Sequence, residues 1–91
     1  MAIQFHIPGV LAPLAGGGRA IAASGATVGE VVADVAARHP ALAGKLRDAR
    51  GEPYPYVVFY LNDDDIRLAQ GFSTPVRDGD EIVVVPAIAG G

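Results

Sequence analysis

The segment S24-G-A-T-V-G-E30 decides the fold, because it marks the start of the main helix. Thr27 and Glu30 have the spacing of a capping box. In this motif the threonine oxygen accepts a hydrogen bond from a free N–H of the first helical turn, and the glutamate side chain accepts one from the N–H of the cap residue. Pro40 is expected to end this helix, and residues 41–47 to add one more helical turn. The apolar residues after the cap recur at helical spacing and form one stripe: Val28, Val31, Val32, Val35 and Ala36.

Two strands are expected before the helix. Ile3, Phe5 and Ile7 alternate with small or polar residues, the period-two pattern of a half-buried strand. Glycine and proline punctuate residues 9–18, which we interpret as a wide turn, and residues 19–23 return as a second strand. The helix therefore follows an amino-terminal hairpin.

Three further strands are expected after the helix. Residues 56–61, Y-V-V-F-Y-L, are rich in branched and aromatic side chains and form the strongest strand. Asparagine and aspartate at 62–65 predict a turn, followed by a short return strand at 66–68. A tight turn at 77–80 leads to the last strand at 81–85.

This order of elements predicts an α+β fold of the β-grasp type, a mixed sheet with one main helix packed across it. In that architecture the first and last strands pair in the middle of the sheet. We expect one domain over residues 1–86 and a flexible tail over residues 87–91, which leaves from a rigid central strand.

Composition excludes several classes of function. Seven lysines and arginines against ten acidic residues give a net charge of −3, which argues against nucleic-acid binding. The absence of cysteine removes disulfides, thiolate metal sites and cysteine nucleophiles. The longest apolar run, residues 82–89, is shorter than the ~20 residues of a membrane span. We expect a cytoplasmic protein with neither nucleic-acid nor membrane partners.

The sequence contains no convincing catalytic constellation. His6 and His39 are the only histidines, too few for a metal trio and without a serine-centred motif for a triad. Asp63, Asp64 and Asp65 lack the further oxygen ligands of a calcium loop and are interpreted as a solvated turn. A carrier, modifier or binding module, free of metal and cofactor, is therefore favoured over an enzyme.

The last strand is apolar on both faces. If Ile82 and Val84 point to the core, Val83 and Val85 point to the opposite face, beside Val58 or Tyr60 of the neighbouring strand. A covering loop is one explanation for such a strand. The other is an exposed apolar patch that binds a partner, and we assign Val83, Val85 and Tyr60 to such an interface.

The chain closes on slim residues. Ala87, Ile88, Ala89 and Gly90 precede Gly91, and only Ile88 can anchor this tail. Because glycine has no Cβ, the backbone of this tail can pass through a narrow crevice of a partner, and the carboxylate of Gly91 can approach a reactive centre there. A carboxylate is inert to nucleophiles until it is activated, so a second protein must supply ATP, Mg²⁺ and electrostatic stabilisation of the transfer.

These features resemble the ubiquitin-like sulfur carriers, a family that serves thiamin, molybdopterin and cysteine biosynthesis. The resemblance runs the whole chain and rests on D78-G-D-E-I-V-V-V-P-A-I-A-G-G91, on Thr27 with its helix, and on L61-N-D-D-D-I-R67. The cysteine branch is the most similar, through F5-H-I-P8, the glycine-rich turn and the N-D-D-D-I-R segment.

The resemblance implies a site, a chemistry and partners. A ubiquitin-activating-type enzyme would adenylate Gly91, and sulfur would replace AMP to give a thiocarboxylate, with residues 87–90 recognised as the tail. A pyridoxal-phosphate cysteine synthase would then transfer the sulfur to an aminoacrylate made from O-phosphoserine, and a zinc metallopeptidase would release cysteine. All cofactors would lie on these partners. Three alternatives stay open: the small subunit of molybdopterin synthase, a modifier that forms isopeptide bonds, and a plain β-grasp adaptor.

Overall fold

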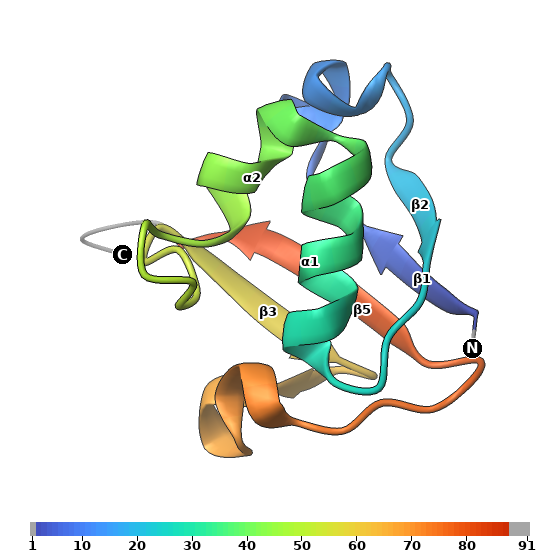
Figure 1. The fold of residues 1–91 in the computed structure, drawn as a ribbon, viewed down its shortest axis with the longest axis vertical. Coiled ribbons are helices and arrows are strands. Elements are labelled where there is room, and N and C mark those ends of the chain that lie inside the picture. Colours follow the sequence, from blue (N-terminus) through green and yellow to red (C-terminus); the bar gives the residue numbers. More distant parts are fainter. Residues whose placement is uncertain (1, 88–91) are drawn as a thin grey trace.

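The computed structural model describes residues 2–87, and its sheet is that of a β-grasp fold (Figure 1). The strands run in the spatial order β2-β1-β5-β3-β4. Their bounds are Ile3–His6 (β1), Ala20–Ala23 (β2), Val57–Leu61 (β3), Asp64–Asp65 (β4) and Glu81–Pro86 (β5). β1 and β5 are parallel neighbours at the centre, and the other pairs are antiparallel. The predicted fold and the central pairing of the first and last strands are confirmed.

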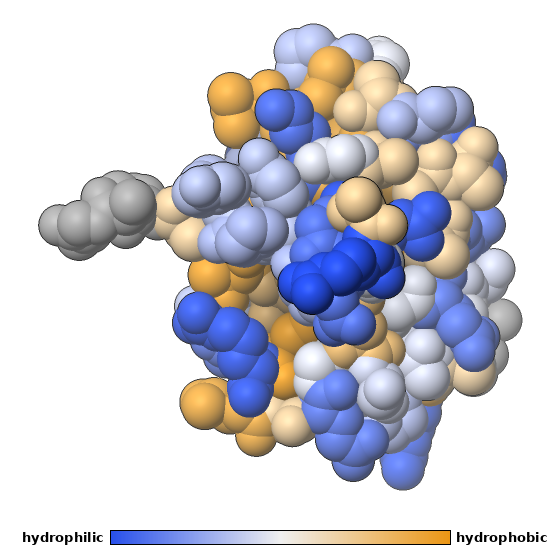
Figure 2. Space-filling view, turned by 60° about the vertical axis from the view of Figure 1, so that its left-hand side comes forward, coloured by the Kyte–Doolittle hydropathy of each residue, from blue (hydrophilic) through white to orange (hydrophobic). Residues whose placement is uncertain are grey.

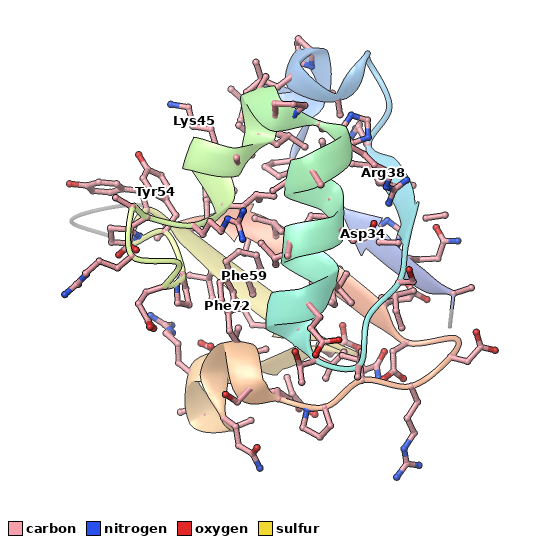
Figure 3. The ribbon with its side chains drawn as sticks, in the orientation of Figure 1. Asp34, Arg38, Lys45, Tyr54, Phe59 and Phe72 are labelled. Atoms are coloured by element: carbon pink, nitrogen blue, oxygen red, sulfur yellow. The ribbon has the colours of Figure 1, made fainter. Side chains whose placement is uncertain are left out.

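Both α-helices cover one face of this sheet, α1 over Val28–Arg38 and α2 over Pro40–Leu46. All five residues of the predicted stripe on α1 are buried, as are Leu42 and Leu46 of α2. They pack against inward residues of the central strands, including Phe5, Phe59, Ile82 and Val84. The Phe59 ring also meets Phe72 edge-on at 5.3 Å between ring centroids (Figure 3).

The start of α1 has the predicted cap, with one difference. The Glu30 N–H donates to Thr27 Oγ1 at 3.1 Å, while Glu30 Oε1 accepts from the Ala26 N–H at 3.0 Å, one residue before the cap amide. Gly25 allows the segment before the helix to pass close to the backbone of α1, because a Cβ at position 25 would lie 2.7 Å from the Val31 nitrogen. The local sequence therefore determines both the residue at which α1 begins and the path of the chain just before it.

Two loop predictions were wrong. The segment interpreted as a wide turn contains a 3₁₀ helix, η1, over Gly9–Ala15, because the Leu11 side chain is buried in the core. The predicted return strand at 66–68 is also a 3₁₀ helix, η2, over Ile66–Leu68, since Asp65 Oδ1 accepts the Arg67 N–H at 2.9 Å and caps it. The strand that returns beside β3 is the two-residue β4. A third 3₁₀ helix, η3, spans Gly71–Ser73.

Candidate docking face and tail exit

The face of the sheet turned away from the helices, called the open face below, contains the residues of the predicted partner interface. Val83 pairs with Tyr60, and Val85 with Val58, across the β3–β5 ladder. All four side chains are partly exposed, whereas the alternate residues of β5 are almost completely buried. The predicted register of the last strand is therefore confirmed, and no loop of residues 2–87 covers these valines fully. Their role as a binding surface stays a prediction.

The tail leaves from the centre of the sheet. Beyond the last ladder pair, Val57 with Pro86, the Ala87 N–H donates to the Tyr56 carbonyl at 2.9 Å, which carries the pairing one residue further. Of the predicted tail-recognition residues, only Ala87 belongs to the described part of the chain. Ile88, Ala89, Gly90 and Gly91 lie outside it.

Beside the tail exit the structure has a small apolar groove that the sequence did not predict. Val10 and Tyr56 are two large apolar side chains on its rim, 76% and 62% exposed. The Tyr54 ring meets Tyr56 edge-on. Lys45 of α2 also belongs to the lining, and Figure 3 shows its amine pointing outward from the helix. The whole lining is Pro8, Val10, Leu11, Lys45, Tyr54, Tyr56, Val57 and Pro86. In Figure 2, hydrophobic residues on the side of the molecule shown gather in separate patches between hydrophilic ones.

A polar network fixes the opposite end of β5. Asn62 donates through Nδ2 to Asp80 Oδ1 (3.0 Å) and accepts the Glu81 N–H at Oδ1 (2.9 Å). Asp80 also accepts the Arg77 N–H at 2.8 Å. The hydrogen bond from Asn62, followed by that from Arg77, holds the pKa of the Asp80 carboxyl below its usual value. The Asp80 carboxylate and the Asn62 amide therefore stabilise the turn before Glu81, the first residue of β5.

Neither histidine joins a reactive cluster. His6 lies on the open face, with Nε2 at 3.2 Å from Glu81 Oε1 but without the alignment of a hydrogen bond. His39 lies between α1 and α2, at the cap of the second helix. Residues 2–87 contain no group of three potential metal ligands and no helix long and apolar enough to cross a membrane.

A β-grasp domain with an apolar open face and a slim tail leaving its central strand has the architecture of a ubiquitin-like carrier. The ThiS family matches residues 5–91, and the chain belongs to this family of ubiquitin-like sulfur carriers.

Known relatives agree with this assignment, and the match to CysO runs along the full length of both chains. The chain is 37% identical over 93 residues to the sulfur carrier protein CysO of Mycobacterium tuberculosis, covering 100% of both sequences. It superposes with a TM-score of 0.90 and 36% identity on a chain of the Amycolatopsis orientalis BexX/CysO complex, covering 99% of this chain and 100% of that one. It is also 38% identical over 66 residues to small archaeal modifier protein 3 of Haloferax volcanii, covering 72% and 71%. The chain is thus a CysO-like sulfur carrier.

Proposed function

We propose that Gly91 is the sulfur-carrying residue and that its thiocarboxylate supplies sulfur for cysteine biosynthesis. The observation that carries this proposal is the end-to-end similarity to CysO, which includes the slim tail. The carboxylate of Gly91 takes AMP from ATP with release of pyrophosphate, and a sulfide equivalent then displaces AMP. The chain itself acts as a carrier and leaves catalysis to partner enzymes in the cytoplasm.

We assign three partners to this cycle by their chemistry. A ubiquitin-activating-type enzyme with ATP and Mg²⁺ forms the adenylate and the thiocarboxylate. A pyridoxal-phosphate cysteine synthase presents an aminoacrylate from O-phosphoserine, the sulfur adds to its β-carbon, and an S-to-N acyl shift leaves cysteine on Gly91. A zinc metallopeptidase adds water across that peptide bond and regenerates the carrier. This chain needs no cofactor of its own in the proposed cycle.

Intact-mass measurement of the carrier tests the cysteine assignment. The thiocarboxylate form, mixed with the synthase and O-phosphoserine, should gain one cysteine residue, about 103 Da above the unmodified chain. Addition of the metallopeptidase should remove it. A chain lacking Gly91 is the matched control and should stay unchanged. A thiocarboxylate that forms but never yields the adduct would contradict the cysteine assignment and leave the carrier function standing. Transfer to molybdopterin synthase would favour that alternative.

A modifier function is the second candidate, supported by the similarity to small archaeal modifier protein 3. The same activated Gly91 could be attacked by a lysine amine of a target protein instead of by sulfide. Denaturing gels of cells that express a tagged chain distinguish the two functions. A ladder of covalent adducts that is lost on deletion of Gly90 and Gly91 supports the modifier, and free carrier alone argues against it. Function that survives this deletion would instead indicate a plain adaptor.

A further inference from the structure

Two side chains of α1 cover the outer edge of β2. Arg38 donates through Nη2 to the Ala22 carbonyl at 2.6 Å, and Asp34 Oδ2 accepts the Ser24 N–H at 3.0 Å. The two side chains also pair with each other at 2.9 Å, one helical turn apart. Figure 3 shows both reaching from the helix toward the strand. They therefore form one bridge between α1 and the sheet edge.

The ladder register identifies which β2 backbone groups face outward. The Ile7 N–H donates to the Arg19 carbonyl at 2.9 Å, so this directly opposed pair is hydrogen-bonded. Hydrogen-bonded and non-hydrogen-bonded pairs alternate along an antiparallel ladder. Ala20, Ala22 and Ser24 consequently turn their N–H and carbonyl groups away from β1. Of these outward groups, the bridge occupies one acceptor, on Ala22, and one donor, on Ser24.

The strand itself lacks the usual protection of an edge. Exposed edges are commonly blunted by charged residues, proline or a bulge on the strand. Residues 20–23 read A-I-A-A, with no charge and no proline, and all four pair with β1 in continuous register. The side chains of Ala20 and Ala22 are exposed methyl groups that leave room for a neighbouring strand. The charged side chains that reach this edge are Asp34 and Arg38 of the neighbouring helix.

We propose that Asp34 and Arg38 hold the β2 edge closed to strand addition, and that the strand this edge would accept is β2 of a second copy of the chain. Two copies can meet antiparallel about a two-fold axis at Ala22, because the segment is uncharged and self-complementary. In that register each Ala22 carbonyl accepts the Ala22 N–H of the other copy, and each Ser24 N–H donates to the other Ala20 carbonyl. Arg38 and Asp34 occupy these same two groups.

The double substitution Asp34→Ala with Arg38→Ala tests the proposal. It removes one acid and one base, so the net charge stays at −3, and alanine preserves the helix. Sedimentation should show the natural chain at its single-chain mass of 9.3 kDa at all concentrations. The double variant should rise toward twice that mass with concentration. Its Ala20 and Ala22 amides should become protected from hydrogen exchange as it does.

Three controls locate the contact. Asp48→Ala with Arg50→Ala also removes one acid and one base, from a loop away from β2, and should leave the chain monomeric. Ala22→Pro added to the double variant should restore the monomer, because the Ala22 N–H is not used by β1 and proline cannot donate to a second strand. If that variant fails to fold, Ala22→Lys replaces it, since it places two like charges opposite each other on the axis.

Several outcomes would overturn the proposal. One is a double variant that stays monomeric at every concentration. Another is association that survives the Ala22 substitution in a folded variant, because the contact would then lie on a different surface. A third is a monomeric double variant that binds a synthetic peptide of residues 18–25, which would show an edge open to strands but not to a second copy. Circular dichroism of each variant verifies that it is folded.

Discussion

Val83 lies directly opposite Tyr60 on the open face of the sheet, between the polar network at one end of β5 and the tail at the other. Because side chains alternate along a strand, this pairing also places Val85 on the open face and Val84 in the core. The side chains of β5 therefore belong to two different surfaces. Every second residue packs against the helices, and the residues between them lie on the open face beside the tail.

Val85→Asp should weaken docking of the activating enzyme without unfolding the carrier. A charge at the centre of an apolar contact costs on the order of 2 kcal/mol or more of binding free energy. The fold should lose little stability, because Val85 is partly exposed. Steady-state adenylation should show a raised KM for the carrier, with the melting temperature nearly unchanged.

Val84→Asp is the matched control for that experiment. Val84 is only 1% exposed, so a carboxylate there would be buried without a partner and should unfold the domain. A Val85 variant that melts early but retains adenylation would contradict the assignment of this residue to the docking face.

Gly25→Ala should destabilise the domain by about 1–3 kcal/mol, the usual cost of overpacking. The new Cβ would meet backbone of the first turn of α1 at 2.7 Å, and backbone cannot move aside as a flexible side chain can. Gly44→Ala in α2 is the opposite case, because nothing lies within 4 Å of its Cβ position. Alanine there should stabilise by about 0.5–1 kcal/mol. Urea unfolding of both variants measures the difference, and equal effects would contradict this account of Gly25.

The carboxyl of Asp80 should contribute to acid sensitivity. Its pKa is lowered in the folded chain, mainly by the Asn62 hydrogen bond, so the unfolded chain binds this proton more readily. The stabilisation is complete above the ordinary pKa of 3.8 and is lost as the pH falls through the lower folded value. Asp80→Asn should make the free energy of unfolding less dependent on pH below the ordinary pKa of 3.8. Urea unfolding at a series of pH values measures this dependence. If the free energy of unfolding varies with pH as much in the variant as in the natural chain, the network is not coupled to stability.

The parts of the fold that local patterns specify could be predicted from the sequence. The cap at Thr27 and the valine stripe after it define a helix without reference to the rest of the chain. The register of β5 followed from placing Ile82 and Val84 in the core. The two 3₁₀ helices that were missed depend on contacts that local patterns do not show. Leu11 packs in the core, and its segment forms η1 instead of an open turn. Asp65 caps η2 at the position where a strand was expected.

The placement of the candidate interface residues on the open face could be predicted, because these residues lie on two strands that pair directly. Alternation along the last strand placed Val83 and Val85 on that face, and Tyr60 was expected beside them on the neighbouring strand; their role as an interface stays a prediction. The apolar groove was missed because Val10, Lys45, Tyr56 and Pro86 come from four separate segments that only the folded sheet brings together. The one local signal was the apolar Val10–Leu11 pair inside a segment that glycine and proline marked as a turn.

Mass spectrometry of the carboxy-terminal peptide tests most directly the central claim that Gly91 carries sulfur. After incubation with the activating enzyme, ATP and a sulfur source, that peptide should gain about 16 Da, the exchange of one oxygen for sulfur, with fragment ions placing the change on Gly91. Omission of ATP should abolish the product. With an enzyme that converts a known carrier in a parallel reaction, an unmodified peptide or a mass change placed on any other residue would contradict the account.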